Sequence, residues 1–297
     1  MSLVINNNLM AMNAARNLGT AYGALGTSVR RLSTGLRVNS AADDAAGLAI
    51  RELMRSDITT LNQGIRNAND AISLIQTADG ALGVIDEKLI RMKELAEQAA
   101  TGTYTSDQRA IIDAEYQAMA SEITRIANGT EFNGVKLLNG NLSGFEHTGD
   151  QVQSTGKLKV HFGLSNSSAE DYYYIRIGTA TASALGIGSG AAAGRDGFSI
   201  STQSAAQHAL DAIRNAIVSK DLIRAELGTT QNRLENTITN LSIQAENLQA
   251  AESRISDVDV SQEMTTFVRN QILTQAAVAM LAQANSLPKL AMQLIGG

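Results

Sequence analysis

AMNAARNLGTAYGALGTSVRRLSTGL, residues 11–36, places apolar side chains at alternating spacings of four and three. This spacing is typical of a helix whose narrow apolar face packs against another helix. The residues of that face are Ala11, Ala15, Leu18, Tyr22, Leu25, Val29, Leu32 and Leu36. Gly35 can adopt the left-handed conformation of a helix stop, and Arg30 and Arg31 lie near the same end, where the helix dipole favours cations. The stretch therefore predicts a helix that ends at about Gly35 and needs a helical partner.

The other end of the chain has the same character. Its apolar spacing of four and three runs through Leu273, Ala277, Met280, Ala284 and Leu287. All 29 acidic residues lie between Asp43 and Glu263, so both ends of the chain are free of acids. An unpaired carboxylate is costly in a dry core, which explains this composition if both ends are buried among copies of the same protein. We expect Leu18, Tyr22, Leu25, Val29 and Leu32 to pack in that core, between copies, with the five C-terminal residues.

Longer helices are predicted between the two ends. One helix is expected from about residue 42 to residue 100, with Ser40 as its cap and Asp43 in its first turn. A third helix is expected from Thr105 or Ser106 to Asn128, and a return helix carries the same spacing from Leu234 to Leu248. Glycines at positions 64, 80 and 83 each cost about 1 kcal/mol relative to alanine, so packing against neighbours must hold the first of these helices.

Residues 130–200 depart from the helical pattern. Asn133-Gly134 and Asn139-Gly140 are turn signals, and residues 158–164 and 172–178 read as strands. Tyr172 and Tyr174 share one face of the second strand, and we expect their replacement by Asp to destabilise the subunit. The glycine-rich residues 186–194 read as a flexible connection, so residues 180–193 are expected to be removable.

Catalytic and ligand-binding chemistry finds no support in the residue pattern. There are no cysteines, and the three histidines have no metal-ligand spacing. A loose dinucleotide match at Gly186, Gly188 and Ala191 lacks the surrounding strand–helix–strand pattern, and the calcium-like start at Asp257 lacks the required Gly and Glu. A net charge of -5 argues against nucleic acid, and the longest apolar run, residues 276–282, is too short to cross a membrane. We therefore expect no enzyme activity, cofactor, metal, nucleic acid or membrane partner.

Self-association is the function that remains. Each terminal helix has an apolar face too narrow to be stable alone in water. Identical subunits that pack head to tail without closing a ring form an open helical filament. The sequence thus predicts a mainly α protein: a long helical-bundle rod with a small β-hairpin insert and paired N- and C-terminal coiled-coil helices.

Four segments resemble bacterial flagellin. They are LSTGLRVNSAADDAAGLAI at 32–50, NGVKLLNG at 133–140, NRLENTITNL at 232–241 and RNQILTQAAVAMLAQANSLP at 269–288. The resemblance covers about residues 1–144 and 197–297. It implies a terminal domain, called D0, from residues 1–44 and 256–297. It also implies a helical rod domain, called D1, from residues 45–144 and 197–255, with residues 145–196 as a short variable insert.

The resemblance also implies partners and a location. It implies a homopolymer in the extracellular flagellar filament, exported by the flagellar type III apparatus without a cleaved signal peptide. It implies an export chaperone at the C-terminal helix, and contacts with filament cap and hook–filament junction proteins. A hook–filament junction protein and a membrane-active helical toxin are the alternatives.

Two smaller sites follow from the same resemblance. Arg91, Leu95 and Glu115 match a patch that Toll-like receptor 5 reads in receptor-active flagellins. The alternative is that Arg91 and Glu115 are plain surface charges and Leu95 is a bundle contact. Ser165, Ser167 and Ser168 lie in an expected exposed turn that can carry O-glycans, with a plain solvated turn as the alternative.

Overall fold

The computed structural model describes residues 8–145, 147–148, 155–167, 170–187 and 199–295, except the side chains of residues 147–148, 155 and 287–295. The chain forms two compact units, which we call the terminal unit (Met1–Ile58 with Glu246–Gly297) and the central unit (Thr59–Ala245). Most described residues are helical, in α1 (Leu9–Thr34), α2 (Ala45–Ala100), α3 (Ser106–Gly129), α4 (Gln203–Ser256) and α5 (Val260–Ile295). The mainly helical fold class is confirmed.

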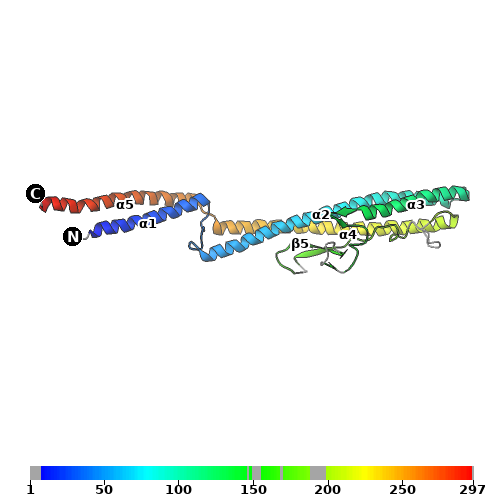
Figure 1. Cartoon of the computed structure of the whole chain (residues 1–297), viewed down its shortest axis with the longest axis horizontal. Coiled ribbons are helices and arrows are strands. Elements are labelled where there is room, and N and C mark those ends of the chain that lie inside the picture. Colours follow the sequence, from blue (N-terminus) through cyan, green and yellow to red (C-terminus); the bar gives the residue numbers. More distant parts are fainter. Residues whose placement is uncertain (1–7, 146, 149–154, 168–169, 188–198, 296–297) are drawn as a thin grey trace. The chain divides into compact units, whose positions relative to one another are not determined.

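In the terminal unit, α1 runs beside α5 (Figure 1). Asn8 caps the start of α1, because its side chain accepts a hydrogen bond of 3.0 Å from the Ala11 amide. Gly35 ends the helix in the left-handed conformation, at φ 72°, and its amide donates to the carbonyl of Arg31. The predicted helix end and the pairing of the two terminal helices are both confirmed.

Helix α2 begins at Ala45, later than the sequence pattern predicted. The Asp44 carboxylate accepts a hydrogen bond of 2.8 Å from the Gly47 amide, which is the role of an N-cap side chain. Ser40 donates its hydroxyl to Asp43 instead, so its predicted role as the helix cap is wrong. That hydroxyl, together with the amides of Asn39 and Ser40, lowers the pKa of Asp43. The ionised Asp43 carboxylate therefore stabilises the turn before α2. Its contribution is complete above the unfolded-state pKa of about 3.9, and it is lost as the pH falls through the lower folded-state pKa.

The central unit builds its core from α2, α3 and α4. Helix α3 begins with a capping box in which Thr105 and Gln108 each bond the other's backbone amide. The fully buried apolar side chains include Leu82, Ile85, Leu89 and Met92 of α2, Tyr116 and Ile123 of α3, and Ile213 and Leu234 of α4. Small residues such as Ala78, Ala120 and Ala216 alternate with them, which allows the helices to approach closely.

Two ion pairs link α2 to α4 inside the central unit. Lys220 is 2% exposed, and its Nζ lies 2.5 Å from an Asp86 oxygen. Arg224, one turn along, bonds both carboxylate oxygens of Asp79 at 2.7 and 3.2 Å. The Lys220 ammonium also lies 2.8 Å from Asp221 on α4 itself, so the pairs with Asp86 and Asp79 of α2 are the ones that favour one register of α4 against α2. No local sequence pattern marks this cluster, because its members lie far apart along the chain.

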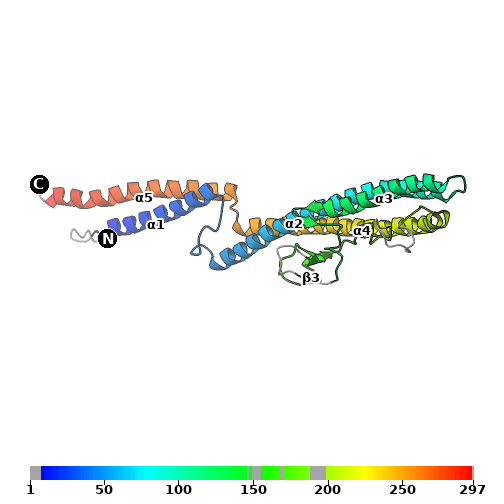
Figure 2. The same cartoon turned by 45° about the vertical axis from the view of Figure 1, so that its right-hand side comes forward.

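The β structure of the described residues consists of three antiparallel hairpins. The pairs are β1 (Glu131–Phe132) with β2 (Val135–Lys136), β3 (His147–Thr148) with β4 (Thr155–Gly156), and β5 (Leu158–His161) with β6 (Tyr172–Ile175). Asn133 and Gly134 both have positive φ angles, 48° and 80°, as a two-residue type I′ turn requires. Strands β5 and β6 confirm the two predicted strand segments, and Figure 2 shows the hairpins alongside the helices of the central unit.

The orientation of the β5–β6 hairpin is opposite to the prediction. Tyr173 meets Phe162 edge to face at 4.8 Å, and the guanidinium of Arg233 in α4 lies 4.3 Å from its ring centroid. Tyr174 is exposed on the other face, so the face shared by Tyr172 and Tyr174, which was expected to matter for stability, is not the face that packs on the helices. The alternation of the strand defines two faces, and the side chains of Val160 and Ile175 make the Tyr173 face the apolar one.

The segment after β6 is also more tightly packed than predicted. Ala180, Ala182, Leu185 and Ile187 are buried. The Ala180 amide donates to the Leu138 carbonyl at 3.0 Å. Residues 180–187 therefore belong to the fold, and the expectation that they are removable is wrong. The rest of the predicted flexible connection, residues 188–194, lies outside the described residues.

Glycines in α2 have two different environments. A Cβ atom on Gly64 would lie 2.1 Å from the carbonyl oxygen of Phe162, so this position allows the backbone before β6 to touch the helix. A Cβ atom on Gly80 or Gly83 would meet no atom within 4 Å.

We predict opposite effects of alanine at these positions. Gly80→Ala and Gly83→Ala should each stabilise the soluble subunit by up to about 1 kcal/mol, because they improve helix propensity without a clash. Gly64→Ala should destabilise it by roughly 1–3 kcal/mol, since the backbone of Phe162 must move. Urea denaturation followed by circular dichroism measures all three, and a Gly64→Ala subunit as stable as Gly80→Ala would contradict the close approach.

Candidate functional site

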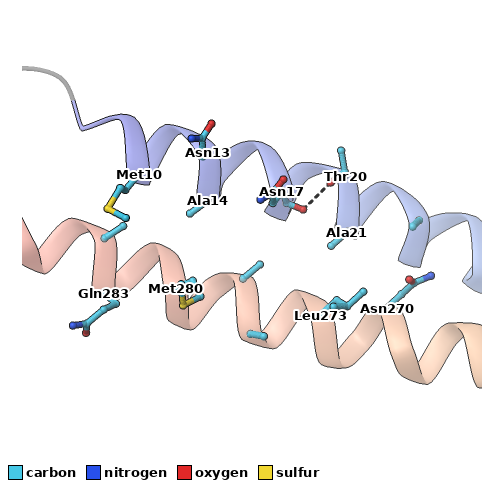
Figure 3. A pocket seen from close by; sticks show the side chains of 14 residues that line it. Met10, Asn13, Ala14, Asn17, Thr20, Ala21, Asn270, Leu273, Met280 and Gln283 are labelled. Atoms are coloured by element: carbon cyan, nitrogen blue, oxygen red, sulfur yellow. Dashed lines mark hydrogen bonds between the residues drawn. The ribbon is translucent and has the colours of Figure 1, made fainter. Parts of the chain in front are cut away.

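A groove runs between α1 and α5 in the terminal unit. Its volume is about 750 Å³, and it is lined by small, apolar and amide side chains from both helices. Figure 3 shows Met10, Ala14 and Ala21 of α1 facing Leu273 and Met280 of α5 across it. The groove has no charged residue in its lining, so it offers no group for acid–base chemistry.

The contact face of α1 has the predicted period but a different set of residues. Leu18, Leu25 and Leu32 are half-buried, as a face against α5 requires. Between them the structure places Ala14, Ala21 and Ser28 rather than Ala15, Tyr22 and Val29. Tyr22 is 55% exposed, and Val29 is also exposed. Small residues at alternate positions permit close approach of the two helices, and the larger neighbours are left outside.

Helix α5 repeats this arrangement. Ala277 is half-buried, and Ala284 is buried with 7% exposure. Thr274 and Leu281 fill the alternate positions, whereas Leu273 and Met280 are exposed. The backbone of Leu287 is helical, and its side chain lies outside the described residues.

Polar contacts fix α1 against α5 near both ends. The Asn8 side chain donates to the Ala284 carbonyl at 2.7 Å, and Arg31 lies 3.6 Å from Glu263.

A short antiparallel bridge joins the segments that follow α1 and precede α5. The Arg37 amide donates to the Ser256 carbonyl at 2.6 Å, and the Val258 amide donates to the Gly35 carbonyl at 3.0 Å. These bonds fix where each terminal helix leaves the rest of the unit.

The outward surface of this helix pair carries many large apolar side chains. On α5 the exposed ones outside the groove are Val260, Met264, Val268, Ile272 and Val278. On α1 they are Leu9, Met12, Tyr22 and Val29. A helix that is apolar around most of its circumference is normally buried, and one intramolecular partner covers only one side of it. We call these exposed residues outside the groove the outer apolar surface; of its members, the apolar seams predicted from the sequence contain only Tyr22 and Val29.

The described residues contain neither a candidate metal site nor a candidate membrane-spanning helix. Within the described residues, no three His, Cys, Asp or Glu side chains are grouped so that they could hold a metal ion. In the same residues, no helix is both long and apolar enough to span a membrane.

The predicted receptor patch lies in the central unit. The Arg91 guanidinium bonds one Glu115 oxygen at 2.8 and 3.0 Å and a Glu94 oxygen at 3.0 Å. Glu115 and Glu94 raise the pKa of Arg91 through these bonds. Leu95 is 2% exposed and packs in the helical core, so only the charged groups reach the surface.

The predicted glycan sites lie in the turn before β6. Ser165 and Ser167 are exposed. The Ser165 hydroxyl and the Ser167 amide both donate to Asp171, at 2.6 and 2.7 Å, and they lower its pKa. Ser168 lies outside the described residues.

Comparison with known proteins agrees with this geometry. The family model for the bacterial flagellin N-terminal helical region matches residues 5–143, and the model for the C-terminal helical region matches residues 210–295. Flagellin of Halalkalibacterium halodurans is 43% identical over 99% of this chain and 100% of its own length. Flagellin of Bacillus subtilis is 42% identical over 98% of this chain and 99% of its own. A hook-associated protein structure from Vibrio parahaemolyticus, at 14% identity and a TM-score of 0.54, covers 72% of this chain and 100% of that one and shares the fold.

The paired helices and their outer apolar surface define a structural, self-associating helical protein. The chain belongs to the bacterial flagellin family, whose members are structural proteins and not enzymes. Neither the hook–filament junction protein nor the membrane-active toxin finds support in the relatives at about 40% identity, which are flagellins, and the hook-associated structure at 14% identity shows a shared fold alone.

Charge at the seam between α1 and α5 should prevent assembly. Ala284→Asp places a carboxylate where the alanine is buried against α1, at a cost of several kcal/mol if the interface is dry. We expect the concentration needed for polymer formation to rise at least about a hundredfold, as measured by sedimentation. Ala284→Ser is the matched control and should polymerise nearly normally, because Ser28 and Thr274 are already accommodated in this seam. If Ala284→Asp polymerised at the same concentration as the wild-type protein, the seam would be accessible to water and the prediction would be wrong.

Proposed function

We propose that this protein polymerises into the extracellular flagellar filament through the outer apolar surface of its paired terminal helices. Flagellins are filament subunits that serve swimming motility, and this chain matches them over nearly its full length. The observation that carries the proposed mechanism is the set of large apolar side chains left exposed on α1 and α5. Burial of such a surface stabilises association by roughly 25 cal/mol per Å² of apolar area.

Assembly is proposed to be heterologous, with one side of the terminal pair packing on a different side of the next copy. Exposed apolar residues occur on both helices and on more than one side of α5, which suits contacts with several neighbours. Contacts that do not close a ring extend without limit. We assign residues 1–44 and 256–297 to the buried filament core, residues 45–144 and 197–255 to the surrounding helical domain, and residues 145–196 to the variable insert.

A substitution on the outer surface tests this mechanism. Ile272 is 59% exposed on α5, so Ile272→Asp should leave the circular dichroism of the subunit unchanged. It should abolish filaments in electron micrographs, because the carboxylate would be buried between copies. Ile272→Leu, the matched control, should polymerise, and deletion of residues 264–297 should yield a soluble helical subunit that cannot. Normal filaments from either Ile272→Asp or the deletion would overturn the proposal.

Other partners follow from family membership. We propose export through the flagellar type III apparatus without a cleaved signal peptide. A flagellar export chaperone is proposed to cover the C-terminal helix before assembly, since the exposed apolar residues of α5 are an aggregation hazard in a free subunit. The filament cap and the hook–filament junction proteins are proposed as partners at the two filament ends. The exposed Ser165 and Ser167, with Ser168, are proposed as O-glycan acceptors.

Toll-like receptor 5 is proposed to read the Arg91–Glu115 pair on the free subunit. The bonds between these side chains hold both charges at fixed positions on α2 and α3, while Leu95 supports them from the core. The proposed contact therefore excludes Leu95, because the receptor cannot reach a side chain that is 2% exposed.

Receptor reporter cells test the patch. Purified subunit should activate them, and Arg91→Ala with Glu115→Ala should reduce activation by at least about tenfold without loss of helicity. Arg125→Ala with Glu122→Ala removes a comparable exposed pair from α3 and serves as the control. A wild-type subunit that fails to activate the cells would end this proposal and leave filament assembly untouched.

A further inference from the structure

The β5–β6 hairpin separates its side chains into two contrasting faces. The register pairs Lys159 with Tyr174 and His161 with Tyr172, so these four residues share one face. Lys157, in the bend before β5, extends this face through its contact with the Tyr174 ring, and Arg176 continues the alternation beyond β6. We call it the cationic face: it comprises Lys157, Lys159, His161, Tyr172, Tyr174 and Arg176. It has three permanent positive charges and no acid, in a protein whose net charge is -5.

Aromatic rings hold the lysines of this face in place. The Lys159 Nζ lies 3.7 Å from the centroid of Tyr172, and the Lys157 Nζ lies 4.4 Å from that of Tyr174. The two rings meet edge to face at 5.4 Å. Such contacts orient an ammonium while leaving its net charge intact. Among the described residues, no carboxylate lies within 4 Å of Lys159, whereas Arg176 lies 3.5 Å from Glu226.

Arg176 reaches Glu226 on α4 at one edge of the face. The interior of the central unit is contacted instead by Tyr173 and Ile175, which lie on the opposite face of the hairpin. Tyr174 is exposed, and the remaining five residues of the cationic face keep part of their surface accessible.

We propose that the cationic face binds acidic polysaccharide. The ammonium groups suit the carboxylates of a polyuronate chain, and the Tyr hydroxyls and the His161 ring offer hydrogen bonds to sugar hydroxyls. Single-stranded nucleic acid fits less well, because base stacking needs open ring faces and a lysine already covers a face of each Tyr ring. The proposal depends on the proposed function in one respect: repetition of the face along a filament adds avidity to a weak single contact.

Binding to immobilised polygalacturonate tests the proposal, with soluble subunit and filaments measured separately. Wild-type subunit should bind at about 10 mM salt and weaken strongly at 0.15 M, because screening shortens the reach of the charges. Lys157→Gln with Lys159→Gln should weaken binding about tenfold, whereas Lys88→Gln with Lys93→Gln on α2, which changes the net charge equally, should not. Filaments should bind at least about a hundredfold more tightly than the subunit.

Each other result has a defined meaning. Equal binding to neutral dextran, equal loss in both double variants, or tighter binding to oligothymidylate than to polygalacturonate would overturn the proposal. If filaments form normally but neither the filaments nor the subunit bind polygalacturonate, the proposal for the cationic face is wrong and the proposed function is unaffected. A subunit that binds through Lys157 and Lys159 but never polymerises would support this inference and remove the proposed function.

Discussion

The surface area of two neighbouring helices limits what the terminal unit can bury alone. Helices α1 and α5 carry apolar residues on more sides than a single partner can cover, so their pairing leaves residues such as Tyr22 and Ile272 in water. Isolated helices of marginal propensity depend on packing for stability. The absence of acids from both ends fits the proposed burial of this surface between copies, where a carboxylate would be costly. In the proposed filament, assembly completes a core that the single chain can only begin.

The central unit, in contrast, buries a complete apolar core within one chain. Its helices bury a full row of large aliphatic side chains, with Leu82, Leu89 and Met92 inaccessible to solvent. The Lys220–Asp86 pair adds register, because a shift of α4 would separate the buried ammonium from Asp86 and leave it only Asp221, its neighbour on the same helix. A unit of this kind can fold before assembly. It supports the surface features, including the Arg91–Glu115 pair, whose positions must be the same in every copy.

Helix periodicity predicted the elements well but could not decide their phase. Adjacent residues on a helix point only about 100° apart, so a spacing of three and four fits two neighbouring sets of residues. The apolar pattern favoured the larger side chains, Tyr22 and Val29, whereas close packing of α1 against α5 places Ala21 and Ser28 in the contact. The same ambiguity affected the strand, in which alternation separated Tyr173 from its neighbours without indicating which face was inside. Local signals with a chemical requirement, such as Asn133-Gly134 at positive φ, were read correctly. Lys220 gave no signal, since its burial depends on residues far away in sequence.

The insert shows how one short segment can satisfy two different demands. Its inner face is committed to the fold, because Tyr173 packs under Arg233 and the Phe162 backbone touches Gly64. A change there must be matched by a change in α2 or α4. Its cationic face is less committed to the fold: Lys159 lies over the Tyr172 ring, Tyr172 meets Tyr174 edge to face, and Arg176 reaches Glu226 on α4. The outer residues can therefore vary in charge and chemistry without disturbing the helices, which makes this face the place where a filament protein can acquire a new surface interaction while its assembly helices stay the same.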